Sequence, residues 1–200
     1  GITGQDGSYL AELLLEKGYE VHGLVRRTSV LNRSRIEHLH QPADGRTGVL
    51  KLHYGDITDL PSLVRVVDEA QPHEVYNLAA QSHVRISFDM PDYTFEVTGK
   101  GTFNVLEAVR RMAPDAKVYQ AGSSEMFGLA EGSPQNEQTP FHPRSPYGIA
   151  KVFAHQTGVL YREAHDLFVA NGILFNHESP RRGANFVTRK IAIAAARIEA

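Results

Sequence analysis

Tyr147 and Lys151 stand four residues apart, within the segment SPYGIAK at 145–151. Ser145 can cap a helix whose first residue is Pro146, and residues at i and i+4 lie on one face of a helix. A nearby ammonium favours the phenolate and lowers the pKa of a tyrosine, which is ordinarily about 10. The spacing is typical of a site that removes a proton from an alcohol; the alternative is a solvated lysine beside a half-buried tyrosine.

A second chemical pattern opens the chain, where Gly1, Gly4 and Gly7 recur at every third position. The apolar residues that follow have helical spacing: Tyr9, Leu10, Leu13, Leu14 and Leu15. A glycine turn before a helix lets the backbone approach a pyrophosphate and directs the positive end of the helix at it. This pattern favours a dinucleotide site over a flexible terminus, formed by Gly1, Ile2, Thr3, Gly4, Gln5, Asp6 and Gly7.

Strands and helices alternate between these two sites. The patterns predict strands at 19–25, 49–54, 74–78, 117–121 and 167–174. They predict helices from the glycine turn to Gly18, from Asp59 or Pro61 to Ala70, and at 93–112, 146–165 and 189–200. This alternation indicates an α/β fold with a doubly wound parallel sheet, the Rossmann arrangement. We expect a dinucleotide-binding domain at 1–175 and the start of a substrate-binding region at 176–200.

The glycine turn needs a preceding strand, which is the central strand of a doubly wound sheet. We therefore expect the sequence to begin just after that strand. We also expect it to stop inside its last helix, before most of a smaller carboxyl-terminal substrate domain. Since the chain opens on Gly1 and not on methionine, a signal peptide stays an open alternative.

Composition narrows the class of protein. The 200 residues are 42% hydrophobic and carry a net charge of −2, so neither nucleic acid nor an anionic membrane is an expected partner. The sequence has no cysteine, which excludes disulfides and thiolate metal sites and fits a reducing compartment. We expect a cytoplasmic protein without a metal site.

Cations follow the predicted strand at 19–25: Arg26 and Arg27, with Thr28 and Ser29 after them. Ligands of doubly wound sheets lie beyond the carboxyl ends of the strands, where an acidic residue is usual at this place if NAD is bound. Guanidinium and hydroxyl groups suit the 2′-phosphate of NADP instead, and the alternative is a basic surface loop. Later strand ends place more residues beside the cofactor: Asp56, Ile57, Ala79, Ala80, Gln81 and Ser82.

The predicted strand at 117–121 is followed by Ser123, Ser124 and Glu125. A hydroxyl at this strand end can orient a substrate alcohol for Tyr147. A dehydrogenase does not need the carboxylate, which can instead remove a proton α to a newly formed carbonyl and so lead to loss of water. The alternative is a capping or surface glutamate.

These motifs together resemble the extended short-chain dehydrogenase/reductases, and within them the GDP-mannose 4,6-dehydratase family. The resemblance covers essentially the whole chain. It rests on GITGQDGSYL at 1–10, NLAAQSHV at 77–84, SSE at 123–125, PRSPYG at 143–148 with Lys151, and NGILFNHESPRRG at 171–183. Glucose-type dehydratases have an Asp-Glu pair where this chain has Ser124 and Glu125. The family implies a hydro-lyase with tightly held NADP that converts GDP-mannose to GDP-4-dehydro-6-deoxy-D-mannose, the precursor of GDP-fucose and GDP-rhamnose.

The resemblance also implies residue roles. Tyr147, supported by Lys151, takes the C4 hydroxyl proton while Ser123 holds that hydroxyl and NADP accepts the hydride. Glu125 removes the C5 proton, and the hydride returns to C6. Leu78, Tyr93, His177 and Arg182 join the cofactor site, with Tyr147 and Lys151. The nucleotide-sugar site takes Ser82, Ser123, Glu125, Tyr147, Asn176, Val187 and Lys190.

Two residues depart from the family pattern, since Ser123 replaces a common threonine and Gly122 a frequent serine. Neither change removes a chemical group of the site. Two rival functions stay open: an epimerase or reductase of the same fold, which would not need Glu125, and a non-catalytic NADP-binding protein. Apolar residues on more than one face of the helices at 93–112 and 146–165 indicate a homodimer or homotetramer.

Overall fold

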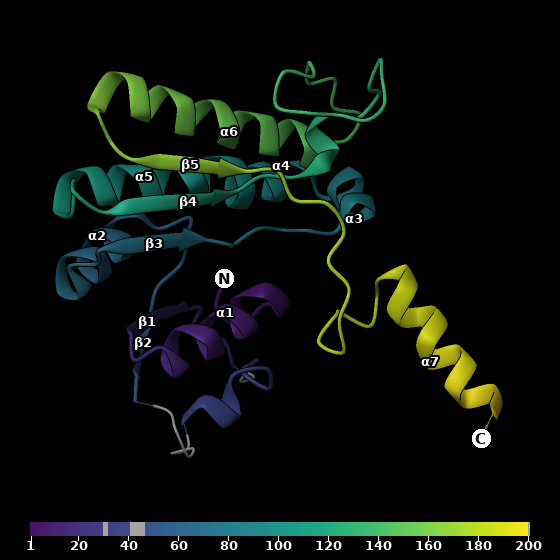
Figure 1. Ribbon diagram of the computed structural model, residues 1–200, viewed down its shortest axis with the longest axis horizontal. Helices are drawn as coiled ribbons and strands as arrows, with labels where there is room; N and C mark the ends of the chain where they lie inside the picture. Colours follow the sequence, from purple (N-terminus) through teal and green to yellow (C-terminus); the bar gives the residue numbers. More distant parts are fainter. Residues whose placement is uncertain (30–31, 41–46, 200) are drawn as a thin grey trace.

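A computed structural model describes residues 1–29, 32–40 and 47–199 (Figure 1). Helices and strands alternate along the chain, as predicted. In order, the elements are α1 (Gln5–Glu16), β1 (Glu20–Val25), η1 (Glu37–His40), β2 (Val49–Tyr54), α2 (Leu60–Ala70), β3 (Glu74–Asn77), α3 (Val84–Asp89), α4 (Pro91–Thr94), η2 (Phe95–Lys100), α5 (Gly101–Met112), β4 (Lys117–Ala121), η3 (Ser124–Met126), α6 (Pro146–His165), β5 (Val169–Gly172) and α7 (Val187–Glu199).

All described strand pairs are parallel, which confirms the α/β class. The strands form two sheets, β1–β2 and β3–β4–β5, where one continuous sheet was predicted. The glycine turn lies between them: a Cβ at Gly1 would be 2.6 Å from the carbonyl carbon of Leu78, which follows β3, and a Cβ at Gly23 of β1 would be 2.5 Å from the Ile2 side chain. The gap therefore lies where the sequence analysis expects a central strand.

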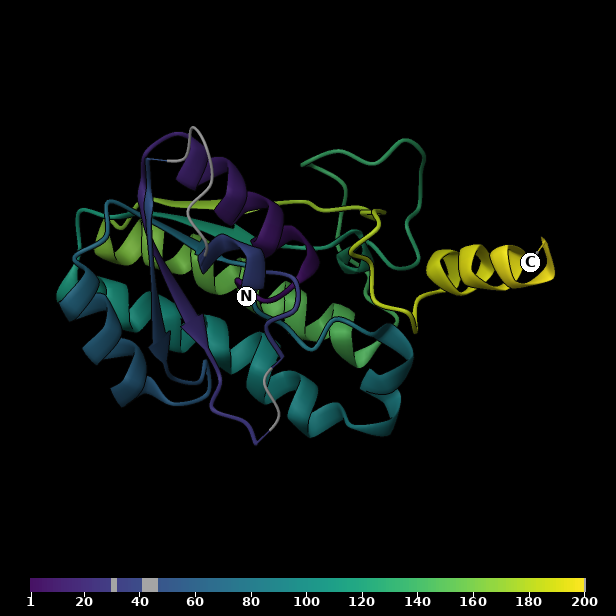
Figure 2. The same cartoon turned by 90° about the horizontal axis from the view of Figure 1, so that it is seen from below.

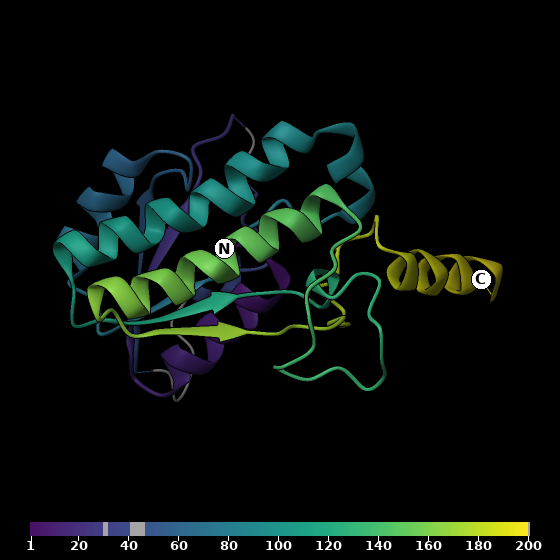
Figure 3. The same cartoon turned by 90° about the horizontal axis from the view of Figure 1, so that it is seen from above.

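Each sheet has its own apolar core. Leu106, Val118, Tyr161 and Val169 belong to the core that joins β4 and β5 to α5 and α6. Figure 3 shows these two helices side by side over the strands. The other core joins β1 and β2 to α1 and is centred on Leu15. The helices packed on each sheet thus hold its strands in place, and the ends of these strands border the region between the two sheets.

The helix predicted at 93–112 is continuous in direction but not in type. It consists of α4, a π-helical turn at η2 and then α5. The strand predicted at 167–174 is shorter, because its pairing with β4 ends where Ala121 meets Gly172 and β4 gives way to η3. The predicted helix at 189–200 begins earlier, at Val187, and Ala200 lies outside the described residues. Figure 2 shows α7 extending away from the two cores.

Candidate active site

A cavity of about 1110 Å³ lies at the carboxyl ends of the strands. Ligand sites of doubly wound sheets occupy this position, and the volume suits a dinucleotide with a second ligand. Most residues named from the sequence line it: Gly1, Thr3, Gly4, Gln5, Asp6, Gly7, Arg26, Arg27, Asp56, Ile57, Leu78, Ala79, Ala80, Ser82, Tyr93, Ser123, Glu125, Tyr147, Lys151, Asn176, His177, Arg182, Val187 and Lys190.

Three residues named from the sequence do not line the cavity. Ile2 packs into the core of α1 instead. The side chain of Gln81 turns toward the neighbouring backbone and helix, where its amide nitrogen donates to the carbonyl of His83 and to the hydroxyl of Thr94. Ser29 is exposed beside the cavity-lining Arg27.

The glycine turn closes tightly at one end of the cavity. The backbone nitrogen of Gly4 donates to the carbonyl of Gly1 at 3.0 Å, and Gly4 is the N-cap residue of α1. A Cβ at Gly7 would lie 2.2 Å from the Gly1 carbonyl oxygen, so only glycine fits there. The amino end of α1 therefore reaches the cavity with free backbone N–H groups, an arrangement that binds phosphates.

Tyr147 and Lys151 lie in the first turns of α6, which begins as predicted. The Ser145 hydroxyl accepts a hydrogen bond from the Gly148 backbone at 3.0 Å and caps the helix. Both side chains are buried, with 8% and 3% of their surfaces exposed. The Lys151 ammonium lies 5.7 Å from the centre of the Tyr147 ring and donates to the Ala121 carbonyl at 2.7 Å. This last bond ties α6 to the end of β4.

The ionisation of Tyr147 differs from the prediction. Burial raises the pKa of its phenol above the ordinary value, and the Glu125 carboxylate raises it further. A hydrogen bond with Ser123 and the cation of Arg182 act in the opposite direction. Burial also lowers the pKa of Lys151 to about 8. Spacing on a helix predicted the proximity of the two groups, but not the desolvation that both undergo.

Ser123 and Glu125 follow β4 directly, at the same end of the cavity. The Ser123 hydroxyl accepts from the Glu125 backbone at 3.2 Å and caps the short helix η3. The Glu125 carboxylate lines the same cavity as Tyr147, and its charge raises the pKa of the phenol. The structure thus unites a phenol, an ammonium, a hydroxyl and a carboxylate, which can remove one proton from an alcohol and a second from carbon.

Gly122, one of the two departures from the family pattern, has a steric reason. Its backbone nitrogen donates to the carbonyl of Gly172 at 2.9 Å. A Cβ at Gly122 would lie 2.2 Å from that same carbonyl oxygen. A serine at this position therefore requires a different spacing between the ends of β4 and β5.

Arginines surround the opposite end of the cavity, and some of them were not predicted from the sequence. Arg26 donates to the hydroxyl of Tyr93 at 3.1 Å, and Arg27 stacks on the ring of Tyr54 at 4.4 Å. Arg33 also donates to the Tyr54 hydroxyl, at 2.9 Å. Arg33 and Tyr54 line the cavity but were not predicted. The available signal was the strand end at Tyr54 and the continuation of the basic run past Ser29.

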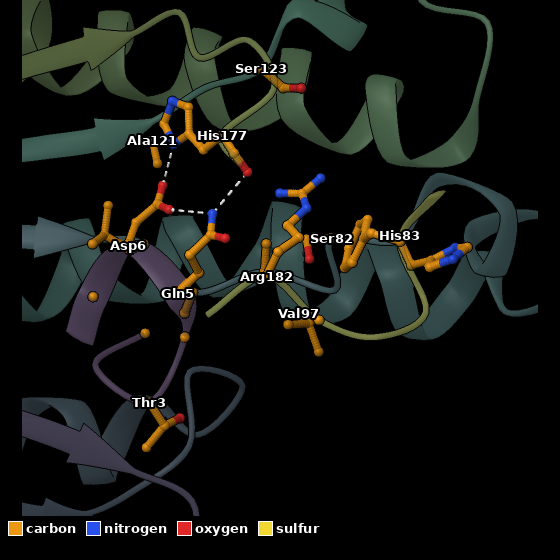
Figure 4. Close-up of a pocket in the computed structure, with 18 of the residues that line it drawn as sticks. Thr3, Gln5, Asp6, Ser82, His83, Val97, Ala121, Ser123, His177 and Arg182 are labelled. Carbon is orange, nitrogen blue, oxygen red and sulfur yellow. Dashed lines mark hydrogen bonds and ion pairs between the residues drawn. The ribbon is translucent and has the colours of Figure 1, made fainter. Parts of the chain in front are cut away.

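The segment after β5 crosses to α1 and supplies His177 and Arg182. The Asp6 carboxylate contacts the His177 ring nitrogen at 2.5 Å, and the Gln5 amide donates to the His177 carbonyl at 2.9 Å (Figure 4). Arg182 lies on the face of the Phe186 ring at 4.0 Å, and its Nε is buried without a hydrogen-bond partner. Both side chains therefore face the cavity from a loop that α1 holds.

Among the described residues, no group of three or more histidine, cysteine, aspartate and glutamate side chains is placed to hold a metal ion. In the same part of the chain, no helix has the length and apolar character that crossing a membrane requires.

Solved structures share the fold. A dTDP-glucose 4,6-dehydratase variant from Streptomyces venezuelae, with NAD bound, superposes with a TM-score of 0.85 at 23% identity and covers 98% of this chain and 60% of its own. RMD from Pseudomonas aeruginosa, complexed with NADPH, gives a TM-score of 0.68 at 28% identity over 74% of this chain and 53% of its own.

Curated relatives are much closer in sequence. GDP-mannose 4,6 dehydratase of Homo sapiens is 59% identical over 99% of this chain, and GDP-mannose 4,6 dehydratase 2 of Arabidopsis thaliana is 60% identical over 100%. The chain spans about half the length of these relatives, 54% of each. The model of the family described as GDP-mannose 4,6 dehydratase matches residues 1–200. On this evidence the chain belongs to the GDP-mannose 4,6-dehydratase family.

Proposed function

We propose that the full-length protein is a hydro-lyase that converts GDP-mannose to GDP-4-dehydro-6-deoxy-D-mannose and water. The observation that carries this proposal is Glu125, placed at the same strand end as Ser123 and beside the buried pair of Tyr147 and Lys151. An epimerase or reductase needs the phenol and the ammonium but not the carboxylate. Membership of the family and the names of its curated relatives agree with this assignment.

The cofactor in this proposal is NADP. A nicotinamide cofactor is supported by the similar solved structures, which carry NAD or NADPH. The 2′-phosphate is assigned from charge: Arg26, Arg27 and Arg33 gather beyond β1 and β2, and they suit a phosphate better than a ribose hydroxyl. The amino end of α1 would hold the pyrophosphate. When bound, NADP supplies the acceptor and donor for an internal hydride cycle.

The residues of the chain then have distinct tasks. Ser123 orients the C4 hydroxyl, and Tyr147, as a phenolate supported by the Lys151 ammonium, accepts its proton. Once C4 is a ketone, the C5 proton becomes acidic and Glu125 removes it. The protonated Glu125 can return this proton to the departing C6 hydroxyl, which leaves as water. After reduction at C6, C5 takes up a proton from a group that exchanges with solvent, and this proton balances the one that Tyr147 accepted. Asn176, Val187 and Lys190, which line the cavity together with Ser82, are proposed contacts for the nucleotide sugar.

The test is Glu125→Gln in the full-length protein with GDP-mannose as substrate. Dehydration should fall by about 10²–10⁴-fold, because a positioned base contributes that much. Binding of NADP and GDP-mannose should persist, since glutamine keeps the size and polarity of the side chain. Mass and sugar NMR identify the product, and in heavy water the unaltered enzyme should place deuterium at C5.

The matched control is Glu131→Gln, which makes the same change at an exposed position. It should leave turnover as it is. An undiminished rate for Glu125→Gln would refute the assigned base. A 4-epimer as the product of the unaltered enzyme would replace the dehydratase assignment with an epimerase.

We further propose that the protein forms a homodimer, or a tetramer built from such dimers. Large apolar side chains on the outer faces of η2, α5 and α6 are exposed: Phe95, Phe103, Ile149, Phe153 and Leu160. Phe95 and Phe153 contact each other, with ring centres 5.2 Å apart, so the exposed surface continues from one helix to the next. A surface of this kind is usual at subunit interfaces.

Light scattering tests this assembly. Leu160→Asp should halve the mass of the particle, because it places a charge in the apolar surface at a side chain that is 56% exposed. Leu129→Asp, in a loop and 59% exposed, should leave the mass as it is. A monomer before any substitution would refute the proposal.

A further inference from the structure

The segment after β5 leaves one half of the molecule and attaches to the other. We call residues 174–183 the strap. The strap begins at the end of β5, in the three-stranded sheet, and lies against α1, which packs on β1 and β2. Its contacts with α1 start at Gln5, whose side chain accepts a hydrogen bond from the Ser179 hydroxyl at 2.9 Å. The strap therefore closes one side of the cavity between the sheets.

The strongest attachment joins Arg181 of the strap to Glu12 of α1. Two guanidinium nitrogens of Arg181 donate to the two carboxylate oxygens of Glu12, at 3.0 and 2.5 Å. Arg181 also donates to the Ser8 hydroxyl at 3.1 Å and lies 4.1 Å from the centre of the Tyr9 ring. Paired donation from a planar guanidinium fixes direction as well as distance.

Both members of this pair are poorly exposed and well supported. Each side chain keeps 23% of its surface exposed. His38 of η1 also contacts Glu12, and the hydrogen bond from Arg181 is the main reason why the pKa of Glu12 lies below its ordinary value. Arg35 holds the backbone of the strap, since its Nε donates to the Arg181 carbonyl at 2.9 Å. The same guanidinium reaches the Thr3 carbonyl, in the glycine turn, at 3.3 Å.

Neither Glu12 nor Arg181 lines the large cavity, whereas Arg182, which follows Arg181 in the chain, does. Among the strap residues that line the cavity, His177 and Arg182 belong to the proposed cofactor site. Arg181 and Arg182 point to opposite sides of the strap, because Arg181 reaches α1 while Arg182 lies on Phe186. Fixing Arg181 therefore fixes where Arg182 enters the cavity.

We propose that Glu12 and Arg181 are positioning residues that hold the strap over the bound dinucleotide and so slow its release. This inference rests on the proposed cofactor site. The pair lies outside the cavity; it sets the places of His177 and Arg182, which would contact the cofactor. Loss of either partner frees the strap near its carboxyl end while the glycine turn and the catalytic groups stay in place.

The first experiment measures NADPH release from the full-length protein by stopped-flow fluorescence. Glu12→Gln and Arg181→Met should each speed dissociation about tenfold, because a strap that has lost this paired contact with α1 opens more often. The double variant should also release NADPH about tenfold faster than the unaltered protein, and not more, since both changes break the same interaction. Glu16→Gln, the same change one turn later on an exposed part of α1, should release NADPH at the unaltered rate.

The second experiment needs no cofactor. In the cofactor-free protein, hydrogen exchange in the peptide at 177–183 should be faster in Glu12→Gln than in the unaltered protein or in Glu16→Gln. The reporting amide is that of Arg182, which donates to the Ser179 carbonyl at 3.0 Å. Exchange in α6 should stay the same, which separates a released strap from general unfolding.

Several results would overturn the inference. Unchanged NADPH release from both single variants, a double variant about a hundredfold faster, or faster exchange in α6 as well as in the strap would each do so. These outcomes are separate from the fate of the proposed function. A protein that forms no dehydrated sugar, but whose NADPH release still depends on the pair, would lose the function and keep the positioning role.

Discussion

The two ends of the cavity are built in different ways. We call Ser123, Tyr147 and Lys151 the catalytic wall, and Arg26, Arg27 and Arg33 the arginine wall. The catalytic wall stands at the ends of β4 and α6, and its residues are 3–8% exposed. The arginine wall stands on loops after β1, and its cations rest on the side chains of Tyr54 and Tyr93.

The difference separates two physical tasks. Proton transfer requires groups placed to within a fraction of an ångström, which regular elements and backbone hydrogen bonds provide. Recognition of a phosphate tolerates loops, because several long cations can adjust around one anion. Burial also affects the two walls differently: it disfavours the charged forms of Tyr147 and Lys151, whereas Arg26 and Arg27 are exposed and Arg27 stacks on the ring of Tyr54.

The largest expected effect comes from Lys151→Met. Activity should fall by about 10²–10⁴-fold, since the phenolate loses its supporting cation. The free energy of unfolding at pH 7 should rise by about 2 kcal/mol. Lowering the pKa of Lys151 from 10.5 to about 8 destabilises the folded protein by about 3 kcal/mol, and methionine removes this penalty but loses about 1 kcal/mol with the hydrogen bond to Ala121. Urea unfolding of the full-length protein and product formation measure the two effects.

The pH dependence gives this prediction its sign. The folded pKa of Lys151 is below the unfolded value, so the unfolded chain binds more protons between about pH 8 and 10.5 and the unaltered protein gains stability over that range. The advantage of Lys151→Met should therefore shrink as the pH rises through this window. A methionine variant less stable than the unaltered protein at pH 7 would contradict the conclusion that burial of the charged Lys151 destabilises the folded protein.

A smaller effect is expected at the arginine wall. Arg26→Met with Arg27→Met should weaken NADP binding about 100-fold, through the loss of charge-assisted hydrogen bonds to the phosphate. NAD binding should change little, because it has no 2′-phosphate. Equilibrium fluorescence titration with the two reduced cofactors measures both. Arg144→Met with Arg197→Met, at exposed positions away from the cavity, controls for the change in net charge. Equal affinity of the unaltered protein for both cofactors would break the comparison.

The smallest effect concerns the contact between α5 and α6, the helix that carries Tyr147 and Lys151. Glu107 of α5 accepts hydrogen bonds from Tyr161 of α6 at 2.9 Å and from Arg110 and Arg111, which lower its pKa to about 2. Glu107→Gln should destabilise the protein by about 1–3 kcal/mol at pH 7. The loss should appear in the urea midpoint and leave the affinity for NADPH unaltered.

The lowered pKa of Glu107 also predicts how the free energy of unfolding changes at acid pH. Because the folded pKa of Glu107 lies below the unfolded one, its contribution is complete above about pH 4.5 and disappears as the pH falls toward about 2. The difference between the unaltered protein and Glu107→Gln should therefore vanish over that range. A difference that is constant with pH would assign the effect to packing alone.

The catalytic wall was far easier to predict from sequence than the arginine wall. The cap at Ser145, the bounds of α6 and the end of β4 follow from local rules, and the structure confirms each of them. Contacts between distant segments have no local signal. Gln81 turns to the hydroxyl of Thr94, Tyr54 receives arginines from another loop, and the pKa of Tyr147 follows burial and not its spacing from Lys151.

The π-helical turn at η2 constrains the length of the chain as well as its composition. Tyr93 and Val97 line the cavity from this side, and Tyr93 meets Arg26 there. Removing one residue from η2 would restore ordinary α-helical bonding and turn everything before it by about 100° relative to α5. Tyr93 would then leave the cavity while α5 stayed in the core. The π-helical turn thus sets the rotation of the segment that carries Tyr93 relative to α5. Insertions and deletions that a surface loop tolerates should therefore be excluded here.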